Sequence, residues 1–337
     1  MRYFQFAASL VLMVHMSAHA AQSCAKPPRA SAVFNVVDSG ARGNGEADDT
    51  AAIQSAIDTM ARTGGTVLVP DGTYMINALV GISIRDDMTL RLSDGATLKA
   101  IPNASDRYNI VKIEKVSNAN LIGGILEGER DAHMGKSGEW GMGVFINAAS
   151  NIAIEGTIAR NAWGDGFYVR GASTNIRFCK VVADNNRRQG MSIISVNGLL
   201  VQDSIFSNTN GAAPQAGIDI EPNENDAVNN VRIQGSRFVD NKGFGVQIYV
   251  APYSSANRSI RNVSVEGNTI TGNQRGGISI AYSDDHKIIG NTLEDNMRVG
   301  IHFAKGTKGN SAINNILGKG NPLVDLGKNN SRNNRFR

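Results

Sequence analysis

From residue 143 onward, short strands that begin with glycine recur along the chain, and apolar residues alternate with other residues within each strand. The seven copies are GVFI at Gly143, GFYV at Gly166, GMSI at Gly190, GIDI at Gly217, GVQI at Gly245, GISI at Gly277 and GIHF at Gly300. Second strands such as NIAIEG and NVRIQGS lie between them, followed by turns that contain Asn, such as ADNN and VDNK. Repeats of about 20 to 50 residues that contain strands and turns but no helices indicate a solenoid.

This solenoid is predicted to be an all-β parallel β-helix. In such a stack, equivalent strands of successive coils lie about 4.8 Å apart, so equivalent residues form ladders along the axis. Gly and Asn tolerate left-handed backbone conformations in the turns, and stacked Asn side chains can satisfy one another's amide groups. A β-propeller would need longer blades with more strands than these intervals contain.

Residues 33–76 have a different pattern: a strand, a Gly-rich loop, an amphipathic helix and further strands. The helix is predicted to begin near Asp49 or Thr50, which are good N-cap residues, and to stop at Gly64 and Gly65. An open β-helix end would expose unpaired backbone and an apolar core, so we interpret this segment as a cap. Helix capping also explains Asp48 and Asp49 better than a catalytic role does.

The same segment closely resembles the opening of the pectate-lyase superfamily module, which is shared by polygalacturonases, rhamnogalacturonases, alginate C5-epimerases and phage tailspike depolymerases. The matching stretches are DSGA at 38–41, GNG at 43–45, DDTAAIQ at 48–54, AI at 56–57, GGTVLVP at 64–70 and GTY at 72–74. The coil pattern carries the resemblance on to about residue 315. It implies a right-handed parallel β-helix that handles polysaccharides. It does not fix the reaction, because the polygalacturonase motifs and the Asp-Pro-His-Glu motif of alginate epimerases are missing.

Aligning the coils on their glycines places Asp219 and Glu221 on one outward face. Residues two apart on a strand share a face with Cα atoms roughly 6.6 Å apart, while Ile218 and Ile220 point to the core. Turns from neighbouring coils bring Asp165 and arginines toward the pair. The candidate catalytic residues are Asp219, Glu221 and Asp165. The candidate substrate-binding residues are Trp163, Tyr168, Arg170, Arg187, Arg188, Ser192, Gln247 and Tyr249.

These residue types fit cleavage of an acidic polysaccharide by hydrolysis or β-elimination. Two neighbouring carboxyl groups raise one another's pKa and can supply an acid beside a base, as glycoside hydrolysis requires. Arginines would hold substrate carboxylates, and Trp163 could stack on a sugar ring. Four long segments flank these coils and are expected to form cleft walls that contribute Trp140, Glu129, His133 and Tyr253. These segments are 127–142, 207–216, 222–230 and 249–260.

Other interpretations stay open. A polysaccharide lyase or a uronan C5-epimerase would use Arg170 or Arg188 to neutralise a uronate, with a tyrosine as acid or base. The acidic pair could hold Ca²⁺ together with Glu224 or Asp226, although two strand carboxylates do not complete a calcium shell. The acids could instead form a surface ladder paired with arginine. A non-catalytic polysaccharide-binding or structural β-helix would show uniform polar ladders, and the clustering here counts against it.

The first residues, MRYFQFAASLVLMVHMSAHAAQ, are typical of a secretory signal peptide, so we predict cleavage of residues 1–21 and a secreted or periplasmic protein. A flexible tail is expected at 22–32, coils at 77–320 and a basic tail at 321–337. With only Cys24 and Cys179, no disulfide framework is expected to carry the fold. The net charge of +4 suits an acidic polysaccharide and is too small for nucleic acid. No other segment approaches the length of a membrane span, and the oligomeric state is not predicted.

Overall fold

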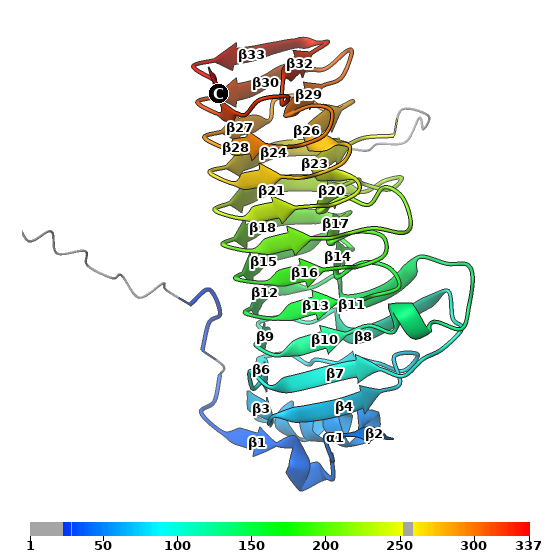
Figure 1. The fold of residues 1–337 in the computed structure, drawn as a ribbon. Coiled ribbons are helices and arrows are strands. Elements are labelled where there is room, and N and C mark those ends of the chain that lie inside the picture. The colour runs from blue at the N-terminus through cyan, green and yellow to red at the C-terminus, as the bar shows by residue number, and fades with distance from the viewer. Residues whose placement is uncertain (1–22, 28, 252–258) are drawn as a thin grey trace, which may run out of the picture.

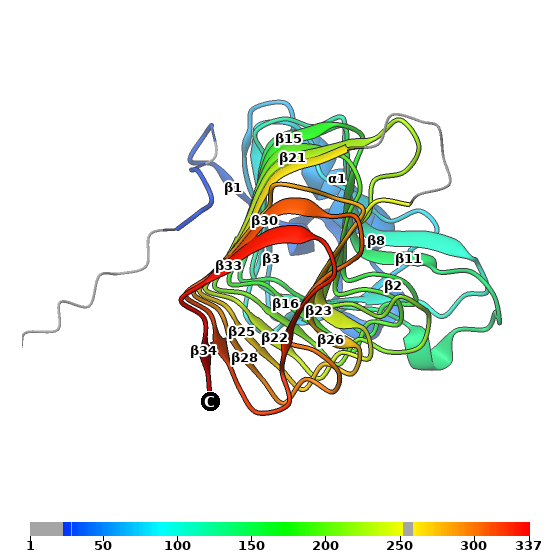
Figure 2. The same ribbon diagram turned by 90° about the horizontal axis from the view of Figure 1, so that it is seen from above.

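The structure, a computed structural model, describes residues 23–27, 29–251 and 259–337. It is a parallel β-helix in which the chain winds through three parallel sheets, called A, B and C here (Figure 1). Viewed along the axis, the sheets enclose one continuous apolar core (Figure 2). The predicted fold class is therefore confirmed. The predicted signal peptide and Tyr253 lie outside the described residues.

Each coil contributes one strand to each sheet, apart from the first and last turns. Sheet A contains β1 (Val33–Asn35), β3 (Gly65–Val69), β6 (Met88–Leu92), β9 (Asn120–Ile122), β12 (Ser150–Glu155), β15 (Ser173–Cys179), β18 (Val196–Gln202), β21 (Ala227–Gln234), β24 (Ser259–Glu266), β27 (Lys287–Ile289), β30 (Lys308–Ile313) and β33 (Lys328–Arg332). Sheet B contains β2 (Asn44–Asp48), β4 (Gly72–Ile76), β7 (Ala96–Ala100), β10 (Ile125–Glu127), β13 (Ile158–Arg160), β16 (Val182–Asp184), β19 (Ile205–Ser207), β22 (Arg237–Val239), β25 (Thr269–Thr271), β28 (Thr292–Glu294), β31 (Ile316–Leu317) and β34 (Arg335–Phe336). Sheet C contains β5 (Ile82–Ser83), β8 (Arg107–Glu114), β11 (Trp140–Asn147), β14 (Phe167–Arg170), β17 (Met191–Ile193), β20 (Ile218–Ile220), β23 (Phe244–Tyr249), β26 (Gly276–Ala281), β29 (Ile301–Phe303) and β32 (Leu323–Asp325).

The helix α1 (Thr50–Met60) lies across the N-terminal end of the coils, next to the short 3-10 helix η1 (Val36–Ser39) (Figure 1). It buries Ile53, Ala56 and Ile57 against the core, as the amphipathic pattern predicts. The Asp48 carboxylate accepts hydrogen bonds from the backbone and hydroxyl of Thr50. The buried Asp49 side chain makes no bond to the helix and instead accepts from two backbone amides of the preceding Gly-rich loop. Both acids therefore hold the cap together, although Asp49 does so through the loop.

The coils extend beyond both predicted boundaries. Strands β1 to β4, within the segment interpreted as a cap, already belong to sheets A and B. At the other end, β32, β33 and β34 continue the three sheets through the segment predicted as a basic C-terminal tail. The polar strands β33 and β34 carry few apolar side chains, but their backbones can still pair with the preceding coil.

The segment predicted as a flexible N-terminal tail is attached to sheet A. Cys24 forms a disulfide with Cys179 at the end of β15. The Glu155 carboxylate accepts hydrogen bonds from Ser23 and from two backbone amides, and Asn120 donates to the Lys26 carbonyl. Disulfides persist in oxidising compartments, so this bond supports an extracytoplasmic location. No described helix has the length and apolar character needed to cross a membrane.

The strand register confirms the outward ladder inferred from the repeats. Its consecutive rungs are Phe145, Tyr168, Ser192, Asp219, Gln247, Ser279 and His302. The alternating apolar residues of the same strands are fully buried in the core. Buried Asn side chains also form ladders: Asn241, Asn273, Asn296 and Asn321 pass one amide hydrogen bond to the next. The predicted mutual satisfaction of stacked Asn amides is therefore confirmed.

The leading glycines are needed for close packing between coils. None of the seven has a positive φ, so left-handed backbone geometry does not explain them. A Cβ atom on Gly217 would lie 2.6 Å from the carbonyl oxygen of Gly245, and the other interior glycines of the row are crowded in the same way by the next coil. The row therefore excludes side chains because two backbones meet there.

We expect Gly217→Ala to lower the free energy of unfolding by about 1 to 3 kcal/mol, because the added methyl group must push two coils apart. Urea unfolding followed by circular dichroism measures this change. The control is Gly290→Asn, at a position with a φ of 64° and no neighbour within 4 Å of a built Cβ, which Asn tolerates. Equal stability of Gly217→Ala and the wild type would contradict this explanation.

Candidate functional site

A cleft with a volume of about 410 Å³ lies on the outer side of sheet C. Strands β8, β11 and β14 form much of its floor, and turns after β17 and β20 close one side. The loop between β10 and β11, which includes η2 (Arg130–Ala132), extends sideways from the coils beside these strands (Figure 2). The cleft is lined by Arg107, Asn109, Glu139, Trp140, Met142, Phe145, Tyr168, Arg170, Arg188, Ile194, Glu221 and Asn223.

Five of the residues predicted from the sequence line this cleft: Trp140, Tyr168, Arg170, Arg188 and Glu221. Arg170 ends β14, Tyr168 lies two residues earlier on the same face, and Glu221 directly follows β20. They come together because the parallel register stacks residues that lie more than 50 positions apart in the chain. The sequence ladder therefore placed Tyr168, Arg170 and Glu221 at the same cleft, and Arg188 reaches it from a turn.

Asp219 faces away from the core, as predicted, but it is only 1% exposed. Its Oδ2 atom accepts a hydrogen bond of 2.8 Å from the amide of Gln189, and its Oδ1 atom has no hydrogen-bond partner among the described residues. Burial raises the pKa of Asp219 well above its usual value, and the charge of Glu221 raises it further, against the opposing effect of Arg188. Burial therefore favours the neutral form of Asp219.

Asp165 is a second buried acid and lies in the turn before β14, fully inaccessible to solvent. Its Oδ2 atom accepts a hydrogen bond of 2.7 Å from the Ser192 hydroxyl and lies 3.3 Å from the Arg188 guanidinium. Burial raises the pKa of Asp165 to about 6, although Arg188 and Ser192 lower it. Asp165 and Ser192 thus support Arg188 from below and do not themselves line the cleft.

Arg188 is the electrostatic centre of the site. Its guanidinium contacts Asp165, donates to Ser192 over 3.2 Å and lies 3.5 Å from the Glu139 carboxylate. Four acidic residues raise its pKa against the effect of burial: Asp165, Glu139, Asp219 and Glu221. One largely buried cation therefore interacts with acids that come from three different coils.

The wall opposite Glu221 comes from β8 and the end of the long loop before β11. Arg107 and Trp140 are paired in the sheet register, and the guanidinium lies 5.1 Å from the Trp140 ring centroid. Met142, Tyr168 and Ile194 form a small apolar cluster on this outer face, with Phe145 packed against it. Burial raises the pKa of Tyr168, and the charge of Asp165 adds to the effect. The floor is therefore apolar, and the charged groups lie around it.

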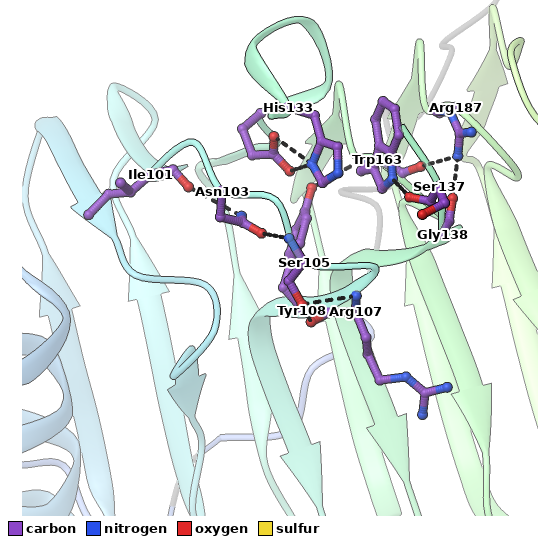
Figure 3. A network of polar contacts seen from close by, with 11 residues as sticks. Ile101, Asn103, Ser105, Arg107, Tyr108, His133, Ser137, Gly138, Trp163 and Arg187 are labelled. Carbon is purple, nitrogen blue, oxygen red and sulfur yellow. Dashed lines mark hydrogen bonds and ion pairs between the residues drawn. The ribbon is translucent and has the colours of Figure 1, made fainter. Parts of the chain in front are cut away.

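Trp163 and Arg187 lie outside this cleft, in a stack that anchors the long loop (Figure 3). The Trp163 ring lies between His133, at a centroid distance of 3.9 Å, and the Arg187 guanidinium, at 3.9 Å. Arg187 also donates to the Gly138 carbonyl, and His133 is hydrogen-bonded to the buried Glu129. These residues, for which the sequence suggested sugar contacts or cleft walls, pack the loop that carries Glu139 and Trp140.

The remaining candidates lie farther along sheet C. Gln247 is the rung after Asp219, and the Tyr249 ring packs edge-to-face against Tyr282. Neither residue lines the cleft described above.

The sequence reasoning missed Arg107, Asn109, Glu139 and Asn223. The repeat alignment began at Gly143, so it did not include β8, whose alternating RYNIVKIE pattern was the signal that could have added Arg107 and Asn109.

Calcium does not fit this cluster of acids. The Arg188 guanidinium already contacts Asp165 and Glu139, where a cation would have to bind. Burial also favours the neutral form of Asp219. Within the described part of the chain, no group of three or more His, Cys, Asp or Glu side chains could hold a metal ion.

Comparisons with known proteins agree with the fold. A family model described as a right-handed β-helix region matches residues 75–249 and 143–317. Uncharacterized protein YclG of Bacillus subtilis is 31% identical over 222 residues, covering 56% of this chain and 38% of that protein. Mannuronan C5-epimerase AlgE1 of Azotobacter vinelandii is 32% identical over 197 residues, covering 52% of this chain and 13% of that protein. The chain spans less than two fifths of the length of these two relatives.

Among solved structures, the A-module of Azotobacter vinelandii mannuronan C-5 epimerase AlgE4 superimposes with a TM-score of 0.70. The match covers 91% of this chain and 97% of that module, at 20% sequence identity. At this level of sequence identity, the similarity shows that the two proteins share a fold.

Proposed function

Because this chain belongs to the right-handed β-helix family, we propose that it is an enzyme that acts on a uronate-containing polysaccharide in the cleft on sheet C. The reaction proposed is removal of the proton next to the sugar carboxylate, at C5, which leads to β-elimination and chain cleavage. The observation that carries the proposal is the position of Glu221, an accessible carboxylate that lines the cleft together with Arg188, Arg170 and Tyr168.

Arginines are suited to a uronate because the planar guanidinium binds a carboxylate through two parallel hydrogen bonds. Arg170 and Arg107 line the cleft, and no ion pair within 4 Å joins either of them to an acid in the described part of the chain. Neutralising the uronate carboxylate makes the adjacent C5 proton more acidic. These two residues are therefore proposed to bind and activate the sugar.

Glu221 is proposed as the base. It takes the C5 proton, the C–H electron pair forms the C4–C5 double bond, and the C4–O bond breaks. Tyr168 is proposed to give its proton to the departing oxygen, because its raised pKa keeps it protonated at neutral pH. Return of a proton to C5 from the opposite face would instead give epimerisation. The relative named as a mannuronan C5-epimerase supports chemistry at this carbon.

Hydrolysis is the second candidate, and the observation that favours it is that Glu139 and Glu221 both line the cleft and both act on Arg188. Hydrolysis needs two carboxyl groups that reach the sugar from opposite sides. The predicted pair of Asp219 and Glu221 does not offer this arrangement, because Asp219 is buried below Glu221. Under this alternative, Glu139 supplies the second carboxyl group that hydrolysis needs.

The test is mass spectrometry of products from a panel of uronate-containing and neutral polysaccharides. An unsaturated uronate end, with absorbance from the new double bond, is the expected result. A gain of one water for each bond cleaved would favour hydrolysis, and unchanged mass with altered NMR stereochemistry would favour epimerisation. Retention on a polymer without any chemical change would replace the enzyme proposal with a binding module.

A further inference from the structure

We propose that Gln189 is a positioning residue that keeps the proton of Asp219 on Oδ1, where it is available to Glu221. The inference rests on the proposed function of Glu221 as a base. Gln189 lies in the turn before β17 and is fully buried, so solvent does not compete for its amide. It does not line the cleft and cannot contact a polysaccharide there.

The orientation of the Gln189 amide is fixed by the backbone. The Ala216 N–H group lies 2.8 Å from the Gln189 side-chain oxygen. A backbone N–H can only donate, so the atom that faces it must be Oε1 and not the NH₂ group. The NH₂ group is then directed at Asp219 Oδ2, over 2.8 Å, and must donate to it.

This contact determines which oxygen of Asp219 carries the proton. Asp219 is buried and forms no ion pair within 4 Å among the described residues, so the neutral carboxyl form is favoured. The oxygen that accepts from Gln189 acts as the carbonyl oxygen. The proton is left on Oδ1, which no other described residue binds.

A proton on Oδ1 gives Glu221 a hydrogen-bond donor from below. Asp219 and Glu221 are two residues apart, and the charge of Glu221 contributes to the raised pKa of Asp219. A hydrogen bond donated by this proton would hold the Glu221 carboxylate in one orientation toward the cleft while leaving its charge intact. Gln189 acts on the reaction only through this pair.

The test compares Gln189→Met with Asn186→Leu as a matched control. Asn186 is also fully buried, and it accepts the Ala162 N–H over 3.0 Å as Gln189 accepts that of Ala216, but it has no contact with Asp219. We expect kcat of Gln189→Met to fall on the order of 10- to 100-fold with KM nearly unchanged, as befits part of an acid–base effect. At matched fractions of folded protein, the control should keep its kcat. An equal loss in both variants would mean that Gln189 is only structural.

Infrared difference spectra test the proton position without any need for activity. The difference between wild type and Asp219→Asn should contain the C=O band of a protonated carboxyl group at neutral pH. In Gln189→Met this band should move to higher frequency, because the carbonyl oxygen loses its hydrogen bond. A missing band, or a band that Gln189→Met does not move, would overturn the inference. If the wild type converts no polymer, the proposed function fails, and the infrared result still decides where the proton lies.

Discussion

Glu221→Gln is expected to lower turnover of a uronate polymer by about 10² to 10⁴-fold, the range associated with loss of a positioned acid or base. Glutamine keeps the size and hydrogen-bonding capacity of the side chain but cannot accept the C5 proton. The free energy of unfolding should change little, because Glu221 lies at the cleft surface. Initial rates by absorbance of the unsaturated product, with urea unfolding in parallel, measure both quantities.

The control for this prediction is Glu224→Gln, a change of the same kind at an exposed position three residues later that does not line the cleft. It should retain wild-type turnover. A fully active Glu221→Gln variant would remove Glu221 from the mechanism and leave it as one member of a surface ladder.

Arg188→Met is expected to have the largest effect on stability, lowering the free energy of unfolding by about 3 to 5 kcal/mol near neutral pH. The side chain is only 14% exposed, and it balances the fully buried Asp165 at 3.3 Å. Methionine fills similar space but removes the cation that allows the buried Asp165 to stay ionised near neutral pH.

The loss of stability in Arg188→Met should depend on pH, and the direction of this dependence follows from the pKa of Asp165. The pKa of Asp165 in the folded protein, about 6, is higher than the ordinary value of 3.8. The folded state therefore binds the Asp165 proton more tightly than the unfolded state does. The resulting contribution to stability is greatest below about pH 4 and is lost as pH rises through 6. Without Arg188 the pKa of Asp165 rises further, so the loss extends to higher pH.

Urea unfolding of Arg188→Met at about pH 4.5 and about pH 7.5 tests this reasoning. The loss of stability should be clearly smaller at the lower pH, where Asp165 is neutral. The double variant Arg188→Met with Asp165→Asn should recover part of the loss near neutral pH, because it carries no unpaired charge at Asp165. The same loss at both pH values would show that packing of the Arg188 side chain, and not its charge, stabilises the turn.

The sequence determined the coil architecture because each coil repeats the same local pattern. A glycine in every copy marks the place where two backbones meet, and alternation of apolar residues fixes the face of each strand. With parallel pairing, those two facts set the register and so predicted the rung from Tyr168 through Ser192 to Asp219.

The tertiary structure decided which rungs are covered and which remain open. Alternation shows that Asp219 faces away from the core. The burial of Asp219 beside the turn that contains Gln189 depends on loop paths that no repeat encodes. For the same reason, loop packing placed Trp163 in a stack with His133 and brought Glu139 to Arg188. The chain by itself specified a ladder of polar residues, whereas non-local packing selected the part of it that forms a cleft.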